Sequence, residues 1–305
     1  MRVLMTTDGS SQATTAIRTA CRLLRKKGRQ VDLLCVAPSY EGPRKREKKA
    51  EFIRKQEEYK KRIDQEANKI LANAQAVLKS EGTEAGLLTE IGSPAGAITR
   101  KASDYDLVVL GAHDQYERGR VGLGPVAARV VANAPNAVLI GRETDAGRSS
   151  MRILAATDGS LASEHALRSM AAFFHAEAAE ITLMHIVETP WVHLGLEQDW
   201  FGHPGKLFAR SDPEAQIDHE LRMEAEEVVV ESQRLLEGLS LSAETIIEEG
   251  DPALEILSEA ERGDYDLIVL GATGEQGLKH QMLGSVSIKV AQNAPCSVFV
   301  ARFIE

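Results

Sequence analysis

The sequence of 305 residues contains few cysteines and no long apolar run. Cys21, Cys35 and Cys296 lie in apolar segments, without a CxxC pair or a histidine at metal-ligand spacing. We therefore expect reduced, buried thiols and neither disulfides nor a zinc site. Because no apolar run could cross a bilayer, a transmembrane helix is excluded. A strand-like pattern begins at the first residues, which leaves no room for a signal peptide and favours a cytoplasmic protein.

Motifs of several phosphate-transferring enzymes are also missing. The sequence has no GxxxxGK[ST] P-loop, no HxGH signature of adenylyl-transferring enzymes and no paired carboxylates suited to two metal ions. Its histidines show no metal-ligand spacing, so a divalent ion such as Mg²⁺ is expected only together with the phosphates of a ligand. These absences disfavour an enzyme with a defined phosphate-transfer reaction.

The net charge of -9 conceals a difference between the two halves of the chain. Residues 1–150 hold 26 basic and 18 acidic side chains, whereas residues 151–305 hold 10 and 27. The basic excess centres on residues 44–62. Apolar residues recur at helical spacing from Phe52 to Val77, so the charges are expected on the solvated face of an amphipathic helix. This pattern disfavours nucleic-acid binding, and the opposite charges of the halves favour their docking.

The two halves repeat each other in sequence. VLMTTDGS at 3–10 returns as ILAATDGS at 153–160, and DYDLVVLGA at 104–112 returns as DYDLIVLGA at 264–272. A polar stretch without an apolar period, residues 142–150, separates the two copies. We therefore predict two tandem domains of the same fold.

The predicted domains, 1–146 and 147–305, each alternate strand and helix patterns. Apolar strands such as VDLLCVA and DLVVLGA alternate with helical patterns such as PVAARVVANA. Strands that are apolar throughout are typical of a parallel sheet covered by helices on both faces, a doubly wound α/β fold. In such sheets ligands bind beyond the carboxyl ends of the strands, where Asp158 and Gly271 fall in the second domain.

An insertion near that edge of the second domain, residues 189–213, holds both tryptophans of the chain. Exposed aromatic residues are costly, so we favour packing of this segment against the neighbouring domain or a second chain. A lid over a ligand is the alternative.

The clearest functional pattern follows the fourth strand of the second domain. Gly271 and Gly274 are separated by two residues, Gly274 and Gly284 by nine, and Ser285 comes directly after. Gly271 is expected to allow a sharp turn and Gly274 a positive φ. Gly284 and Ser285 open a helix whose free N–H groups and dipole favour a phosphate. The hydroxyls of Ser285 and Ser287 are expected to add donors.

Three further residues complete the predicted nucleotide site. Lys279 and His280 lie in the arch of the loop, where they are placed to reach phosphates. Asp158, at the end of the first strand, is placed to accept hydrogen bonds from an adenosine. His280 is also the one loop residue suited to proton transfer, which leaves slow ATP hydrolysis open.

Both halves resemble universal stress protein domains, and the whole chain resembles a tandem member of that family. The family's ATP-binding pattern, G-x2-G-x9-G-[S/T], is met in full by the loop of the second domain. The resemblance implies ATP, with Mg²⁺, bound by Ala156, Thr157, Asp158, Ile186, Leu270, Gly271, Thr273, Gly274, Gly284, Ser285, Val286 and Ser287. It also implies a five-stranded parallel sheet of order 3-2-1-4-5 in each domain. The domains would associate through their last strands, AVLIG and SVFVARF, as a homodimer or pseudo-dimer.

The first domain departs from this pattern. Its glycine series reads Gly111, Asp114, Gly124 and Pro125, so a carboxylate replaces the second glycine and would repel phosphates. Pro125 removes both a backbone N–H group and the hydroxyl donor. Two loop arginines, at positions 118 and 120, would offset Asp114 only in part. We therefore predict a degenerate phosphate loop in this domain.

The leading hypothesis is an ATP-binding stress-response regulatory protein with one nucleotide site, in the second domain. Its ligand would act through conformation or assembly and through a regulatory protein partner. Two alternatives stay open: a slow ATPase or phosphotransferase that uses His280 or Ser285, and a binding module for a non-nucleotide ligand in the first domain.

Overall fold

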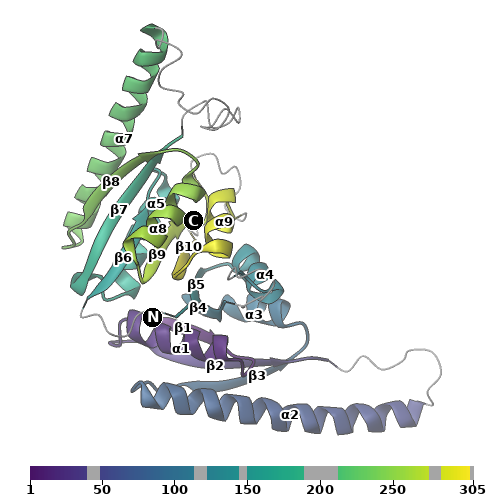
Figure 1. Cartoon of the computed structure of the whole chain (residues 1–305). Helices are drawn as coiled ribbons and strands as arrows, with labels where there is room; N and C mark the ends of the chain where they lie inside the picture. The colour runs from purple at the N-terminus through teal and green to yellow at the C-terminus, as the bar shows by residue number, and fades with distance from the viewer. Residues whose placement is uncertain (40–48, 113–121, 144–149, 189–211, 275–282, 303–305) are drawn as a thin grey trace.

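The computed structural model describes residues 1–39, 49–112, 122–143, 150–188, 212–274 and 283–302 (Figure 1). The predicted loop residues Asp114, Arg118, Arg120, Lys279 and His280 lie outside these ranges, as does most of the 189–213 insertion. No helix in the described ranges is long and apolar enough to cross a membrane.

Both halves of the chain alternate strands and helices in the same order. The elements of the first half are β1 (Arg2–Thr6), α1 (Ser11–Leu23), β2 (Gln30–Ala37), α2 (Lys49–Ser80), β3 (Gly86–Ile91), α3 (Pro94–Ala102), β4 (Leu107–Gly111), α4 (Pro125–Asn133) and β5 (Ala137–Gly141). Those of the second half are β6 (Met151–Ala156), α5 (Leu161–Phe173), η1 (Ala176–Ala178), β7 (Ala179–Val187), α7 (Asp212–Gly238), β8 (Glu244–Glu249), α8 (Pro252–Gly263), β9 (Leu267–Gly271), α9 (Ser285–Asn293) and β10 (Ser297–Ala301).

All ten described strands join in one sheet of order β3-β2-β1-β4-β5-β10-β9-β6-β7-β8. Within each half the strands are parallel and follow the predicted order 3-2-1-4-5, so the α/β fold is confirmed. The halves meet where β5 pairs antiparallel with β10, with Leu139 opposite Phe299. The predicted pseudo-dimer through the last strands is therefore confirmed within a single chain, and Figure 1 shows these two strands side by side.

Helices cover both faces of this sheet, as the continuous apolar strands predict. On one face, α1, α2, α5 and α7 pack over residues such as Leu33 and Leu183. On the other face, α3, α4, α8 and α9 pack over residues such as Val108 and Ile268. Each of these two cores contains buried residues of both halves, so the sheet and its covering layers continue across the junction.

The cysteine prediction is also confirmed, because all three are free and buried. Burial raises the pKa of each thiol, that of Cys296 to about 12. A buried thiol of this kind stays protonated near neutral pH and reacts slowly.

Aromatic contacts reinforce the junction between the halves. The ring of Phe299 in β10 packs edge-on against Phe174, with ring centroids 5.0 Å apart, and against Phe173 at 5.9 Å. Leu24, just after α1, forms an antiparallel bridge with Phe174, just after α5. Phe174, Phe299 and Leu24 are fully buried, so the centre of the molecule is apolar where the two halves touch.

The repeated DYD sequence has a structural role at the amino-terminal ends of the strands. The Asp266 carboxylate accepts a 2.9 Å hydrogen bond from the Arg152 backbone N–H. In the first half, the Asp106 carboxylate accepts the equivalent bond from the Arg2 backbone N–H at 2.6 Å. Each arginine also lies over the ring of the DYD tyrosine, at 5.2 Å for Arg152 and 4.9 Å for Arg2. The motif therefore fastens β4 to β1 and β9 to β6, away from the carboxyl ends of the strands.

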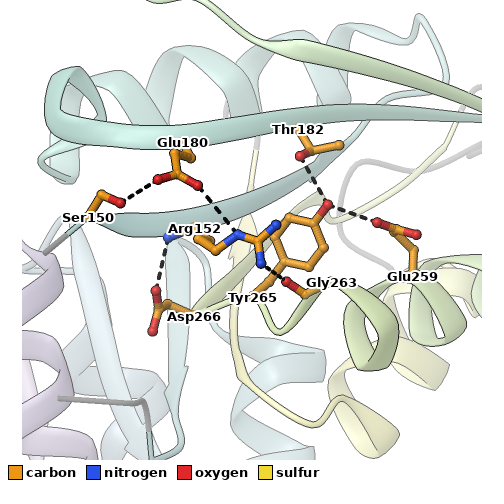
Figure 2. A network of polar contacts seen from close by, with 8 residues as sticks. All are labelled: Ser150, Arg152, Glu180, Thr182, Glu259, Gly263, Tyr265 and Asp266. Carbon is orange, nitrogen blue, oxygen red and sulfur yellow. Dashed lines mark hydrogen bonds and ion pairs between the residues drawn. The ribbon is translucent and has the colours of Figure 1, made fainter. Parts of the chain in front are cut away.

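Tyr265, two residues before β9, links β7 and α8 in the second half (Figure 2). Its hydroxyl is hydrogen-bonded to Thr182 of β7 at 3.0 Å and to Glu259 of α8 at 2.9 Å. Burial, together with the Glu259 carboxylate, raises the pKa of Tyr265, so the hydroxyl keeps its proton for this network. Glu259 is only 5% exposed and therefore depends on such donors.

We predict that Tyr265→Phe lowers the free energy of unfolding by about 1–2 kcal/mol, because it removes a donor from the buried Glu259 carboxylate. Urea denaturation would measure this loss. Tyr105→Phe is the matched control: its hydroxyl bonds the less buried Asp32 at 2.8 Å, so a smaller loss is expected. Equal losses in the two variants would contradict a special role for the Glu259 contact.

Candidate functional site

The structure brings the predicted site residues of the second half around one pocket at the carboxyl ends of β6, β7 and β9. This pocket has a volume of about 1070 Å³ and lies between these strand ends and the first turn of α9. All twelve predicted residues line it: Ala156, Thr157, Asp158, Ile186, Leu270, Gly271, Thr273, Gly274, Gly284, Ser285, Val286 and Ser287. A volume of this size accommodates a nucleotide-sized ligand.

Sequence reasoning missed one wall of the pocket. Leu221, Ala225 and Val228 of α7 line it, and so do Pro252 and Ile256 of α8. The sequence could have indicated Pro252, because GDPA at 250–253 repeats GSPA at 92–95 of the first half. No sequence pattern indicated the α7 residues, because their position at the pocket depends on how this long helix packs against the sheet.

The helices that begin at this pocket differ in how their first N–H groups are satisfied. At α5, the Ser160 hydroxyl accepts from the Ser163 N–H at 3.2 Å. At α8, the Asp251 carboxylate accepts from two N–H groups, at 2.9 and 3.1 Å. At α9 the N-cap residue is Gly284, which has no side chain to cap the helix. The first turn of α9 therefore offers backbone donors to a ligand.

The Asp251 cap also has an electrostatic partner on α9. Although burial acts to raise its pKa, the Leu254 N–H and the Lys289 ammonium, which lies 3.2 Å away, hold the pKa of Asp251 below its usual value. Asp251 is therefore a carboxylate near neutral pH. Because Lys289 engages it, α8 and α9 are tied together next to the pocket.

The structure corrects the conformation predicted for Gly274 and adds a packing role for Gly271. Gly274 was expected to have a positive φ, but it does not belong to the glycines with positive φ. Instead, a Cβ atom on Gly274 would lie 2.8 Å from the Asp158 carboxylate, so the position is restricted by contact. A Cβ on Gly271 would lie 2.8 Å from the Ala162 backbone, at the start of α5. Gly271 therefore allows close packing of strand and helix.

The same packing accounts for one glycine that the first half retains. A Cβ on Gly111 would lie 2.9 Å from the Ala13 backbone N–H nitrogen, at the equivalent position of α1. This restriction exists whether or not a phosphate binds nearby. Retention of Gly111 is therefore compatible with a degenerate loop.

The hydroxyl of Ser287 is engaged within the protein, contrary to the expectation that it faces a ligand. It donates a 2.7 Å hydrogen bond to the Gly271 carbonyl, and Ser287 is 6% exposed. The hydroxyl of Thr157 is likewise buried, 3.2 Å from Ser163 and 3.1 Å from Ser232. Ser285, by contrast, is exposed at the start of α9. Of the two serines predicted as hydroxyl donors, Ser285 is the one open to the pocket.

Asp158 lies at the edge of the pocket as predicted, after β6. One carboxylate oxygen accepts from the Ser160 N–H at 3.1 Å and from the Ser160 hydroxyl at 2.6 Å. The other carboxylate oxygen is the one that would lie 2.8 Å from a Cβ atom on Gly274. These contacts orient the carboxylate toward the loop, and Asp158 is exposed.

The described residues contain no group of three or more His, Cys, Asp or Glu side chains that could hold a metal ion. Three acidic residues line the pocket without forming such a group: Asp158, Glu188 and Glu224.

The equivalent helix of the first half begins differently. Gly124 is the N-cap of α4 without a side-chain cap, but Pro125 occupies the first helical position. Proline fits this position and carries no N–H group. The N–H that Ser285 offers in α9 is therefore absent from α4.

The family model described as the universal stress protein family matches residues 1–142 and again 150–302. This chain belongs to the universal stress protein family. The two matches are consecutive, so it is a tandem member, and they correspond to the two halves of the ten-stranded sheet.

Relatives in this family include single-domain and tandem proteins. Universal stress protein YxiE of Bacillus subtilis is 31% identical over 151 residues, which are 50% of this chain and 98% of that protein. A universal stress protein of Mycolicibacterium smegmatis is 24% identical over 98% of this chain and 96% of its own length. The crystal structure of a universal stress protein from Archaeoglobus fulgidus superposes over 99% of this chain and 98% of its own, with a TM-score of 0.63 at 17% identity. That structural likeness concerns the fold.

We predict that Ser287→Ala lowers the free energy of unfolding by about 1 kcal/mol, because it deletes the hydrogen bond that joins α9 to the end of β9. Ala127 stands at the equivalent position of α4 and is buried there, so alanine is compatible with this fold. Ser285→Ala, at the exposed neighbour, should change stability by less than about 0.5 kcal/mol. Urea denaturation compares the two variants, and equal losses would contradict the structural role of Ser287.

Proposed function

We propose that this chain is an ATP-binding regulatory protein with one nucleotide site, in the pocket of its second half. The observation that carries the proposal is the uncapped first turn of α9, which begins at Gly284 and faces a nucleotide-sized pocket. A helix N-terminus without a side-chain cap favours an anion through its free N–H groups and its dipole. The glycine spacing of the loop supports a phosphate as that anion.

The residues around the pocket fit the parts of ATP. In this proposal the phosphates would lie at the N–H groups of α9 and at the Ser285 hydroxyl. The adenosine lies toward Asp158 and the backbone of Ile186, against the apolar side chains that α7 and α8 contribute. Mg²⁺ would accompany the phosphates and neutralise part of their charge.

The proposed role is regulation and not a defined reaction. ATP would stabilise one arrangement of the loop, α9 and the helices that line the pocket, and a protein partner would recognise that arrangement. Because the last strands of the two halves already pair with each other, any further self-association would use another surface. The proposal places the chain in the cytoplasm, the compartment that supplies ATP.

The first half is proposed to hold no ATP. Pro125 takes the place of the first N–H donor of the helix, and the sequence places Asp114 where a phosphate would need a small neutral residue. A carboxylate near phosphates and a missing donor both act against binding. The proposal is therefore one ATP per chain.

We predict that nucleotide-stripped, full-length protein binds ATP with Mg²⁺, and that Gly284→Asp weakens this binding at least about tenfold. An aspartate at the N-cap would occupy the free N–H groups of α9 and place a negative charge beside the phosphates. Gly284 has φ -66° and ψ 155°, which any residue can adopt, so the variant should fold. Isothermal titration calorimetry measures affinity, and thermal unfolding checks that the fold persists.

Gly124→Asp is the matched control, because Gly124 is the N-cap of α4 with φ -66° and ψ 162°. This variant should bind ATP like the original chain. Absence of binding by the original chain at millimolar ATP would contradict the proposal, and so would an equal loss in both variants.

A further inference from the structure

Two buried arginines cross the junction between the halves in opposite directions. Arg142 directly follows β5 and is 5% exposed, and Arg302 directly follows β10 and is 6% exposed. Both side chains extend into the other half of the chain, where each meets the carboxyl-terminal end of a helix. Charged side chains are seldom buried to this extent unless they are hydrogen-bonded.

Arg142, from the first half, binds the end of α9. Its guanidinium donates to the Ala291 carbonyl at 2.8 Å and to the Cys296 carbonyl at 3.2 Å, in the segment from α9 to β10. Its backbone is held on both sides of the junction. The N–H donates to the Ser297 hydroxyl at 3.0 Å, and the carbonyl accepts from the Thr19 hydroxyl at 2.8 Å.

Arg302, from the second half, makes the reciprocal contact with α4. Its guanidinium donates to the carbonyls of Val131 and Ala132, at 2.6 and 2.9 Å. The two helices thus receive similar support, each from an arginine of the other half. They differ at their opposite ends: α9 begins with Ser285 at the nucleotide pocket, whereas α4 begins with Pro125.

We propose that Arg142 is a positioning residue for the nucleotide site, so that the first half of the chain takes part in ATP binding by the second. The inference rests on the proposed function. It holds that Arg142 fixes the end of α9 through the Ala291 carbonyl and thereby fixes the N–H groups of its first turn against the pocket.

The geometry of α9 makes such coupling effective. A helix of nine residues is about 13 Å long, so a displacement at one end moves the other end as part of the same rigid element. A cation at the carboxyl-terminal end also stabilises the helix through its dipole. Loss of both effects should weaken ATP binding by about 3- to 30-fold, the upper part of the range of helix-terminus interactions, which buried geometries favour.

The test compares Arg142→Met with Arg302→Met in the full-length protein. Both variants remove one buried guanidinium and its helix contact from the same junction, so both should lose stability. Methionine retains an unbranched apolar side chain in each case. Two readouts are needed: ATP affinity by calorimetry, and amide hydrogen exchange of α4 and α9 without nucleotide.

We expect faster exchange in α9 and weaker ATP binding for Arg142→Met. Arg302→Met should show faster exchange in α4 and an ATP affinity within about twofold of the original chain, since α4 does not reach the pocket. Arg142→Lys, which keeps a cation at the end of α9, should recover part of the lost affinity.

Equal losses of ATP affinity in the two methionine variants would overturn the inference, because the arginines would then act only on the junction. Unchanged affinity in Arg142→Met would overturn it as well. If the original chain itself binds no ATP, the proposed function fails, and that outcome is visible before any variant is compared. The hydrogen-exchange readout shows separately whether each arginine holds its helix.

Discussion

The antiparallel pairing of β5 with β10 is the constraint on which the rest of the molecule depends. Each half, taken alone, would leave an edge strand that is buried on both faces and has unpaired backbone groups. Pairing the two edges satisfies these groups and joins both cores across the junction. It also brings the end of each last strand beside the last helix of the other half, where Arg142 and Arg302 make their contacts.

The two halves share residues that fold the chain and differ at residues that are proposed to face a ligand. Asp106 and Asp266 fasten their strands in the same way, and Gly111 and Gly271 permit the same close packing. One such difference falls at the first helical position after the loop, which is proline in one half and Ser285 in the other. Packing restricts the shared residues in both halves, whereas under the proposed function phosphate binding restricts only Ser285.

Much of the fold could be predicted because its signals are local or repeated. Apolar strands that alternate with helical patterns predicted a parallel sheet, and the duplicated segments predicted two similar domains. The strand order and the association of the last strands were implied by the resemblance to universal stress proteins. The twelve predicted site residues lie around one pocket because they follow strand ends, which a parallel sheet collects at one edge. Their role in binding nucleotide stays a prediction.

Other features could not be read from the sequence, since they depend on contacts between distant segments. A Cβ atom on Gly274 would lie close to the Asp158 carboxylate, and a glycine in a sequence does not by itself distinguish such a close contact from a positive φ. A serine at the start of a helix can face a ligand or the protein, and Ser287 bonds to Gly271 because β9 ends beside it. The reach of Arg142 into the other half follows only from the antiparallel junction.

The central claim is that one half of this duplicated chain binds ATP and the other does not. The most direct measurement is native mass spectrometry of the full-length, nucleotide-stripped protein titrated with ATP and Mg²⁺. Saturation at one ATP per chain is the predicted result. Saturation at two per chain, or an absence of bound ATP, would contradict the account.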